Sequence, residues 1–171
     1  MNNPLRIAIW LASLTVFLIT LAASSAWLPE QVATHFNGAG EANGWMSRSV
    51  HLMAFGAFGV LFPAFFIGLF YSIRFLPPSL LNVPNHKYWR APEHYPDACR
   101  FMFEQSFIVA TIASMFVTGV NILVVRSNLP NPPHMPLMPI LIVTGLFLVS
   151  LLFWSIRLIR FFGKTGASGK T

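Results

Sequence analysis

Four long apolar segments alternate with three polar stretches along the chain, and this pattern predicts the architecture. The apolar segments cover about residues 5–26, 50–73, 103–125 and 137–156. Each is long enough to cross the roughly 30 Å hydrocarbon core of a bilayer as a helix. We therefore predict an all-α fold, a four-helix transmembrane bundle made by residues 1–160 as one domain. Residues 161–171 contain Gly, Ser and Lys and are predicted to form a flexible cytoplasmic tail.

The first apolar segment has two interpretations. Ser24 and Ala26 resemble the small residues that precede a signal-peptidase cleavage site. The apolar run, however, is as long as a complete span, whereas the core of a signal peptide has about 7–15 residues. We therefore expect the segment to be retained as the first span.

Composition favours an integral membrane protein over a soluble domain. Only 9% of the residues are charged and 55% are hydrophobic, whereas soluble domains have about 25% charged residues. The formal net charge of +6 does not indicate nucleic-acid binding here, because basic residues also flank membrane spans. Cys99 is the only cysteine, so an intrachain disulfide and a cysteine metal cluster are excluded. The expected partner is the lipid bilayer, and no nucleic acid.

The basic residues are distributed unequally between two sets of polar stretches. The stretches 28–48 and 126–136 contain only Arg48 and Arg126, whereas the amino end, the 74–100 stretch and the tail contain nine basic residues. The nine are Arg6, Arg74, Lys87, Arg90, Arg100, Arg157, Arg160, Lys164 and Lys170. Because basic loops stay in the cytoplasm, we predict a multi-pass membrane protein with both termini cytoplasmic. The 28–48 loop then forms a short extracytoplasmic cap.

Polar side chains with binding chemistry concentrate in the 28–48 loop. His35 lies between Glu30 and Glu41, with Asn37 and Asn43 nearby. A histidine with two carboxylates suits a metal ion or acid–base chemistry, but the spacing matches no established metal motif. We therefore predict no metal, no other cofactor and no catalytic residue, and treat the five side chains as candidate ligand-binding residues.

A simpler interpretation of the same loop is a folded cap without a ligand. Its His and Glu side chains would then hydrogen-bond the loop backbone, while Trp27 and Trp45 anchor its two ends at the membrane interface.

The 74–100 stretch is rich in proline, aromatic and charged residues. Prolines at 77, 78, 84 and 92 exclude a continuous helix over its first two-thirds, and Pro96 precedes a plausible helix start. Tyr88 and Trp89, beside Lys87 and Arg90, are typical of interfacial anchors that contact anionic lipid. Glu104, at the start of the third span, is a residue type that favours a helix N-terminus.

Two predicted spans carry features that bear on helix packing. In the second, Gly56, Gly59 and Gly68 allow neighbouring helices to approach closely. In the third, polar residues recur at spacings of three and four and so share one face. They are Thr111, Ser114, Thr118 and Asn121. We expect them to form interhelical hydrogen bonds of about 0.6 kcal/mol each; a polar translocation path is the alternative.

Two segments resemble a known family. Leu28–Trp45 resembles the LP-x-x-V/I-P-x-H-F/W-N-x-x-G-x-x-D/N-G segment of a domain of unknown function in small bacterial membrane proteins, which include the SdpI-like toxin-immunity proteins. Asn82–Glu93 is similar to the N-x-P-N-x-x-Y-W-x-A-P-E segment of four-span members. The resemblance implies a bacterial inner-membrane protein of largely unassigned role. It also marks a set of cytoplasmic-loop motif residues: Asn85, Tyr88, Trp89, Pro92 and Glu93.

These observations favour a binding or regulatory membrane protein that senses or sequesters an extracytoplasmic peptide or small ligand, or provides immunity. Its further partners would be another membrane protein or a second copy of the chain. A small transporter or permease subunit is the alternative, based on the polar face of the third span. A metal-dependent membrane enzyme is a third hypothesis, but the sequence contains no recognisable nucleophile–base set, so we predict a protein that is not an enzyme.

Overall fold

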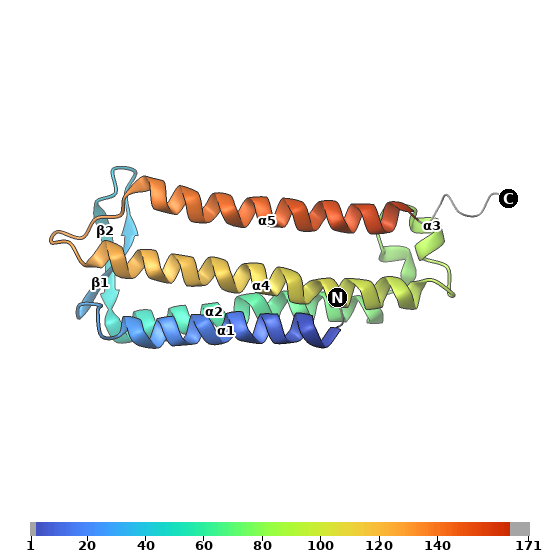
Figure 1. The fold of residues 1–171 in the computed structure, drawn as a ribbon, viewed down its shortest axis with the longest axis horizontal. Coiled ribbons are helices and arrows are strands. Elements are labelled where there is room, and N and C mark those ends of the chain that lie inside the picture. The colour runs from blue at the N-terminus through green and yellow to red at the C-terminus, as the bar shows by residue number, and fades with distance from the viewer. Residues whose placement is uncertain (1–2, 165–171) are drawn as a thin grey trace.

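Four long helices dominate the computed structural model, which describes residues 3–164 (Figure 1). They are α1 (Asn3–Ser24), α2 (Arg48–Ser72), α4 (Tyr95–Asn128) and α5 (Leu137–Lys164). All four are long and apolar enough to cross a membrane. The predicted all-α class with four transmembrane helices is confirmed.

Helix α4 begins at Tyr95, beside the helix start predicted at Pro96, and extends beyond the predicted span of residues 103–125 at both ends. Pro96 lies in its first turn, where proline is tolerated because the missing N–H has no helical partner. Asp97 adds a negative charge next to the positive end of the helix dipole. Glu104 lies well inside the helix, so the expectation that it marks the N-terminus is wrong.

Helix α5 is also longer than predicted, because it continues from residue 156 to Lys164. Residues 161–164 therefore belong to this helix and not to a flexible tail. The remainder of the predicted tail, 165–171, lies outside the described residues.

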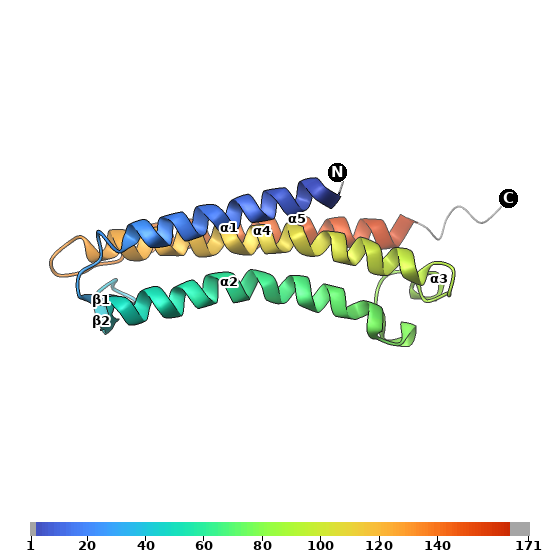
Figure 2. The same cartoon turned by 90° about the horizontal axis from the view of Figure 1, so that it is seen from below.

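Helix α4 is the centre of the bundle, since α1, α2 and α5 all pack against it (Figures 1 and 2). Many of its buried positions carry small side chains, which let the other backbones approach. They include Ala98, Cys99, Ser106, Ala110, Ala113 and Ser114. Successive long helices run in opposite directions, so the connections gather at two ends of the molecule (Figure 1).

The 28–48 loop contains a β-hairpin that the sequence analysis did not predict. Strands β1 (Gln31–Phe36) and β2 (Ala42–Ser47) pair antiparallel at one end of the bundle, which we term the hairpin end. At the opposite end the 74–100 stretch forms two 3₁₀ helices, η1 (Ile73–Phe75) and η2 (Pro78–Leu80), and the short helix α3 (His86–Trp89). This interrupted structure agrees with the proline-based prediction. We term this the α3 end.

Close helix contact at Gly56 and Gly59 agrees with the prediction. A Cβ atom at Gly59 would overlap the ring of Phe17 in α1, and one at Gly56 would lie 3.0 Å from Cδ2 of Leu21. Gly68 differs, because nothing lies within 4 Å of its virtual Cβ.

The polar face of α4 is packed against the bundle, but its hydrogen bonds were predicted wrongly. The hydroxyls of Thr111 and Thr118 donate to the carbonyls of Phe107 and Ser114, each one turn earlier in the same helix. Ser114 and Asn121 are 0% and 1% exposed. A hydroxyl that finds an acceptor within its own helix does not need a neighbouring helix, and the tight packing gives the transporter alternative no support.

Candidate functional site

The side chain of Asn128, in the last turn of α4, binds the hairpin. Its Oδ1 accepts from the backbone N–H of Ala33 at 2.8 Å, and its Nδ2 donates to the Ala33 carbonyl at 2.9 Å. Both backbone groups of Ala33 are thereby satisfied, and both residues are buried. The outer edge of β1 is therefore closed by α4. The sequence analysis did not select Asn128, because one asparagine after an apolar span carries no distinctive signal.

The other parts of the hairpin are also fixed to neighbouring segments. An Arg48 guanidinium nitrogen donates to the carbonyls of Leu28 at 3.0 Å and Ser25 at 3.3 Å. At the tip, the backbone N–H of Met135 donates to the Gly40 carbonyl at 2.9 Å. Gly40 has φ of 83°, and a Cβ there would overlap the carbonyl oxygen of Met135, so glycine is required on two grounds.

Two of the five candidate residues, Asn37 and Glu41, are brought together in the turn. The Asn37 amide nitrogen donates to Glu41 Oε2 at 2.9 Å, and its Oδ1 accepts from the backbone N–H of Ala39 and Glu41. This arrangement is an Asx-type turn, which explains the asparagine structurally.

The other three candidates, Glu30, His35 and Asn43, are exposed and have no side-chain hydrogen bond within residues 3–164. His35 lies opposite Gly44 in the hairpin, where a Cβ would be only 3.0 Å from its ring. No group of three His, Cys, Asp or Glu residues suited to a metal ion occurs within the described range. The hairpin thus presents an exposed polar surface, and the geometry does not support the metal-enzyme hypothesis.

One edge of the hairpin is open around Trp45, although Glu41, just before β2, forms an antiparallel bridge with His134. In an antiparallel pair, the backbone groups of successive residues point alternately toward the partner strand and away from it. Ala33 points away from β2, since it binds Asn128, and Trp45 lies directly opposite Ala33. The N–H and C=O of Trp45 therefore point outward from β2. Among the turn, loop and cap hydrogen bonds of residues 3–164, none involves these two groups, and Trp45 is 54% exposed.

At the α3 end, two motif residues bind the C-terminus of α5. Asn85 Nδ2 donates to the carbonyls of Phe162 at 3.1 Å and Gly163 at 3.0 Å. Trp89 Nε1 donates to the Phe162 carbonyl at 3.1 Å. The last carbonyls of a helix lack intrahelical donors, so Asn85 and Trp89 cap α5. Asn85 is the N-cap of the short helix α3 and Trp89 is its last residue, so α3 holds both side chains against the end of α5.

The remaining motif residues have different environments. Tyr88 stacks on His94 with ring centroids 3.8 Å apart, whereas Pro92 and Glu93 are exposed. Trp89 is buried in a cluster with Leu81, Ala98 and Phe162. The prediction of an interfacial anchor is thus wrong for Trp89, which packs inside the protein.

A partly buried ion pair joins α1 to α4 near this end. Arg6 and Glu104 are 2.7 Å apart, with 6% and 26% of their side chains exposed. The sequence analysis assigned both residues other roles, because nothing in the sequence shows which residues of two distant spans face each other.

Comparison with known families gives one match. Residues 9–60 match the domain of unknown function DUF1648. The matched range begins in α1, includes the whole hairpin with its five candidate residues, and ends within α2; the Asn82–Glu93 segment lies outside it. Searches of curated proteins and of solved structures give no match. With its four apolar helices, the chain is an integral membrane protein, and its residues 9–60 are similar to a domain of unknown function.

Proposed function

We propose that this protein is a binding or regulatory protein of the bacterial inner membrane whose hairpin recognises an extended peptide on the extracytoplasmic side. The observation that carries the proposal is the asymmetry of the two strand edges. Asn128 occupies the β1 edge at Ala33, whereas the β2 edge is open at Trp45, beyond the bridge between Glu41 and His134. An open strand edge pairs with an extended peptide through main-chain hydrogen bonds.

The side chains near this edge suit such a role. Asn43 and Trp45 are the two exposed residues of β2 and alternate with half-buried neighbours, so both lie on its exposed face. Both are exposed, so an added strand would contact an amide and an indole in succession. The anchors at Asn128, Arg48 and Gly40 hold the hairpin in place, which lowers the ordering cost of binding.

The resemblance of Leu28–Trp45 to SdpI-like proteins suggests a biological role for the hairpin. Some members of that group provide toxin immunity, so sensing or sequestering a harmful extracytoplasmic molecule is the role we propose for this surface. His35 and Glu41 would contribute polar contacts beside the strand edge.

The orientation is part of the proposal and makes the first prediction. Most of the basic residues belong to the α3 end, including Arg74, Lys87, Arg90 and Arg157, so this end should be cytoplasmic. In a Cys99→Ala background, Ala39→Cys is expected to react with a membrane-impermeant maleimide on right-side-out spheroplasts. Lys87→Cys should react only after permeabilisation, and the opposite labelling pattern would reverse the orientation.

The second prediction concerns peptide binding at Trp45. Wild-type protein in nanodiscs would select peptides from a phage-displayed random nonapeptide library, and affinities would be measured for two variants. Trp45→Pro removes the outward N–H, and proline is tolerated at an edge position whose N–H makes no ladder bond. Trp45→Ala keeps the N–H. We expect at least a tenfold loss for Trp45→Pro and a smaller loss for Trp45→Ala.

Circular dichroism and the thermal midpoint would show that Trp45→Pro remains folded. Strand addition is refuted if the peptides bind Trp45→Pro as tightly as wild type, or if no sequence is enriched over empty nanodiscs. It is also refuted if His35→Ala with Glu41→Ala abolishes binding while Trp45→Pro leaves it unchanged, since the contacts would then be to side chains alone.

A further inference from the structure

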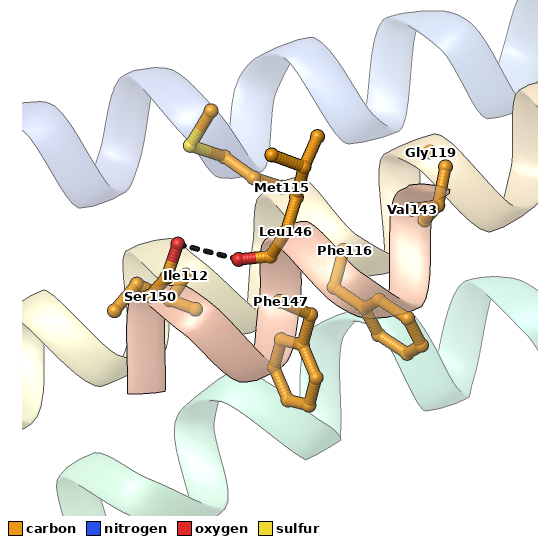
Figure 3. Close-up of a pocket in the computed structure, with 8 residues that line it drawn as sticks. All are labelled: Ile112, Met115, Phe116, Gly119, Val143, Leu146, Phe147 and Ser150. Atoms are coloured by element: carbon orange, nitrogen blue, oxygen red, sulfur yellow. Dashed lines mark hydrogen bonds between the residues drawn. The ribbon is translucent and has the colours of Figure 1, made fainter. Parts of the chain in front are cut away.

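A continuous groove follows the seam between α4 and α5. It consists of three hollows in series, of which the one nearest the hairpin end is drawn in Figure 3. The middle hollow shares Ile112 and Ser150 with the first, and it shares Phe153 and Arg157 with the third. Because neighbouring hollows share lining residues, the three lie end to end along the seam.

The walls of the groove are apolar. Met115 and Leu146 point toward the α1 side of the seam, and Phe116 and Phe147 point toward the α2 side (Figure 3). The two Phe rings stack with centroids 4.4 Å apart. The Ser150 hydroxyl donates to the Leu146 carbonyl at 2.8 Å and offers no free proton to a ligand. This part of the groove therefore suits a hydrocarbon chain.

Two arginines lie at the α3 end of the groove. Arg157 and Arg160 line the third hollow, are exposed, and are three residues apart on one helix, so their side chains are neighbours. Neither lies in an ion pair within residues 3–164. Two carboxylates at this end are already paired, Glu104 with Arg6 and Asp97 with Arg100. The two guanidiniums thus remain available for an external anion.

The dimensions of the groove fit a lipid. The helical rise from Val143 to Arg157 is about 21 Å, and one leaflet contributes about 15 Å of hydrocarbon to a bilayer. A chain that starts beside Arg157 can therefore lie in the groove over its full depth in one leaflet. Guanidinium groups bind phosphate through paired hydrogen bonds.

We propose that the α4–α5 groove binds an anionic phospholipid, with its phosphate at Arg157 and Arg160 and one acyl chain along the seam. A second copy of the chain is a poorer occupant. Copies inserted in the same orientation and related by a twofold axis along the membrane normal would bring two pairs of arginines to the same depth, where like charges repel.

The experiment is native mass spectrometry of the protein released from nanodiscs that contain equal amounts of palmitoyl-oleoyl phosphatidylglycerol and phosphatidylcholine. Wild type should retain the anionic lipid at least tenfold over the zwitterionic one. Arg157→Gln with Arg160→Gln should remove the preference. Lys87→Gln is the matched control, because it removes a basic charge at the same end but outside the groove. Ser150→Trp fills the groove without changing charge and should reduce retention of both lipids.

A further arm uses dihexanoyl phosphatidylglycerol, which has the same headgroup but short chains and should compete poorly. The proposal fails if the two lipids are retained equally, or if Lys87→Gln has the effect of the double arginine variant. It fails equally if Ser150→Trp changes nothing, if the short-chain lipid competes fully, or if the released species is a lipid-free dimer. Circular dichroism of each variant would establish that its helices are intact.

Discussion

Replacing Gly59 with alanine is expected to lower the free energy of unfolding of the bundle by about 1–3 kcal/mol, the usual cost of overpacking. Phe17 of α1 is fully buried against Gly59, and a Cβ there would overlap its ring, with Cε2 at 2.9 Å. The ring is also packed with Leu21 and Val117, so it has no free space into which to move. Reversible unfolding by steric trapping in bicelles would measure the loss.

Gly68→Ala is the matched control for this substitution. Gly68 lies in the same helix but has nothing within 4 Å of a virtual Cβ. Alanine there should be neutral or stabilise the helix by up to about 1 kcal/mol through its helix propensity. Combining Gly59→Ala with Phe17→Leu should recover part of the stability. Equal effects at positions 59 and 68 would show that contact with Phe17 is not the cause.

The contrast between these glycines shows how far the sequence predicts packing. Hydropathy locates the four spans because about 20 consecutive apolar residues are needed to cross a bilayer. The rotation of each helix about its axis depends on the partner helix, so the sequence does not distinguish Gly59 from Gly68.

The candidate sites were predicted unevenly for a related reason. The polar residues of the 28–48 loop were found from their residue types, but the strands were not, because Gly and Asn obscure the alternation expected of a hairpin. The resemblance marked Asn85 and Trp89, whereas their cap on α5 depends on contacts across more than seventy residues of sequence. Long-range contacts of this kind leave no periodic signal within either segment.

The lipid groove had only indirect sequence support. The sequence analysis used Arg157 and Arg160 only to predict the membrane orientation. That use depends on their charge and not on their position along the α4–α5 seam. A charge at a span boundary and a charge at the mouth of a groove look identical in the sequence. Only the relative placement of two helices separates them.

The ion pair between Arg6 and Glu104 makes the second large prediction. Replacing Glu104 with leucine is expected to cost about 3–5 kcal/mol, because it leaves a buried guanidinium without its counter-charge. The Arg6 side chain is 6% exposed, so solvent cannot replace the carboxylate in this conformation. Arg6→Met should cost less, since the Glu104 side chain, at 26% exposed, is less enclosed than that of Arg6. The same unfolding assay would measure both variants.

The double variant, Arg6→Met with Glu104→Leu, separates a charge effect from a packing effect. Removing both charges leaves two apolar side chains at the α1–α4 contact, so the double variant should be more stable than Glu104→Leu alone. Asp97→Asn serves as the exposed control: it breaks the Asp97–Arg100 pair, whose side chains are 58% and 72% exposed, and should cost about 1 kcal/mol or less. Additive costs in the double variant would mean that the two charges do not stabilise each other, and the ion pair would then have no role in joining α1 to α4.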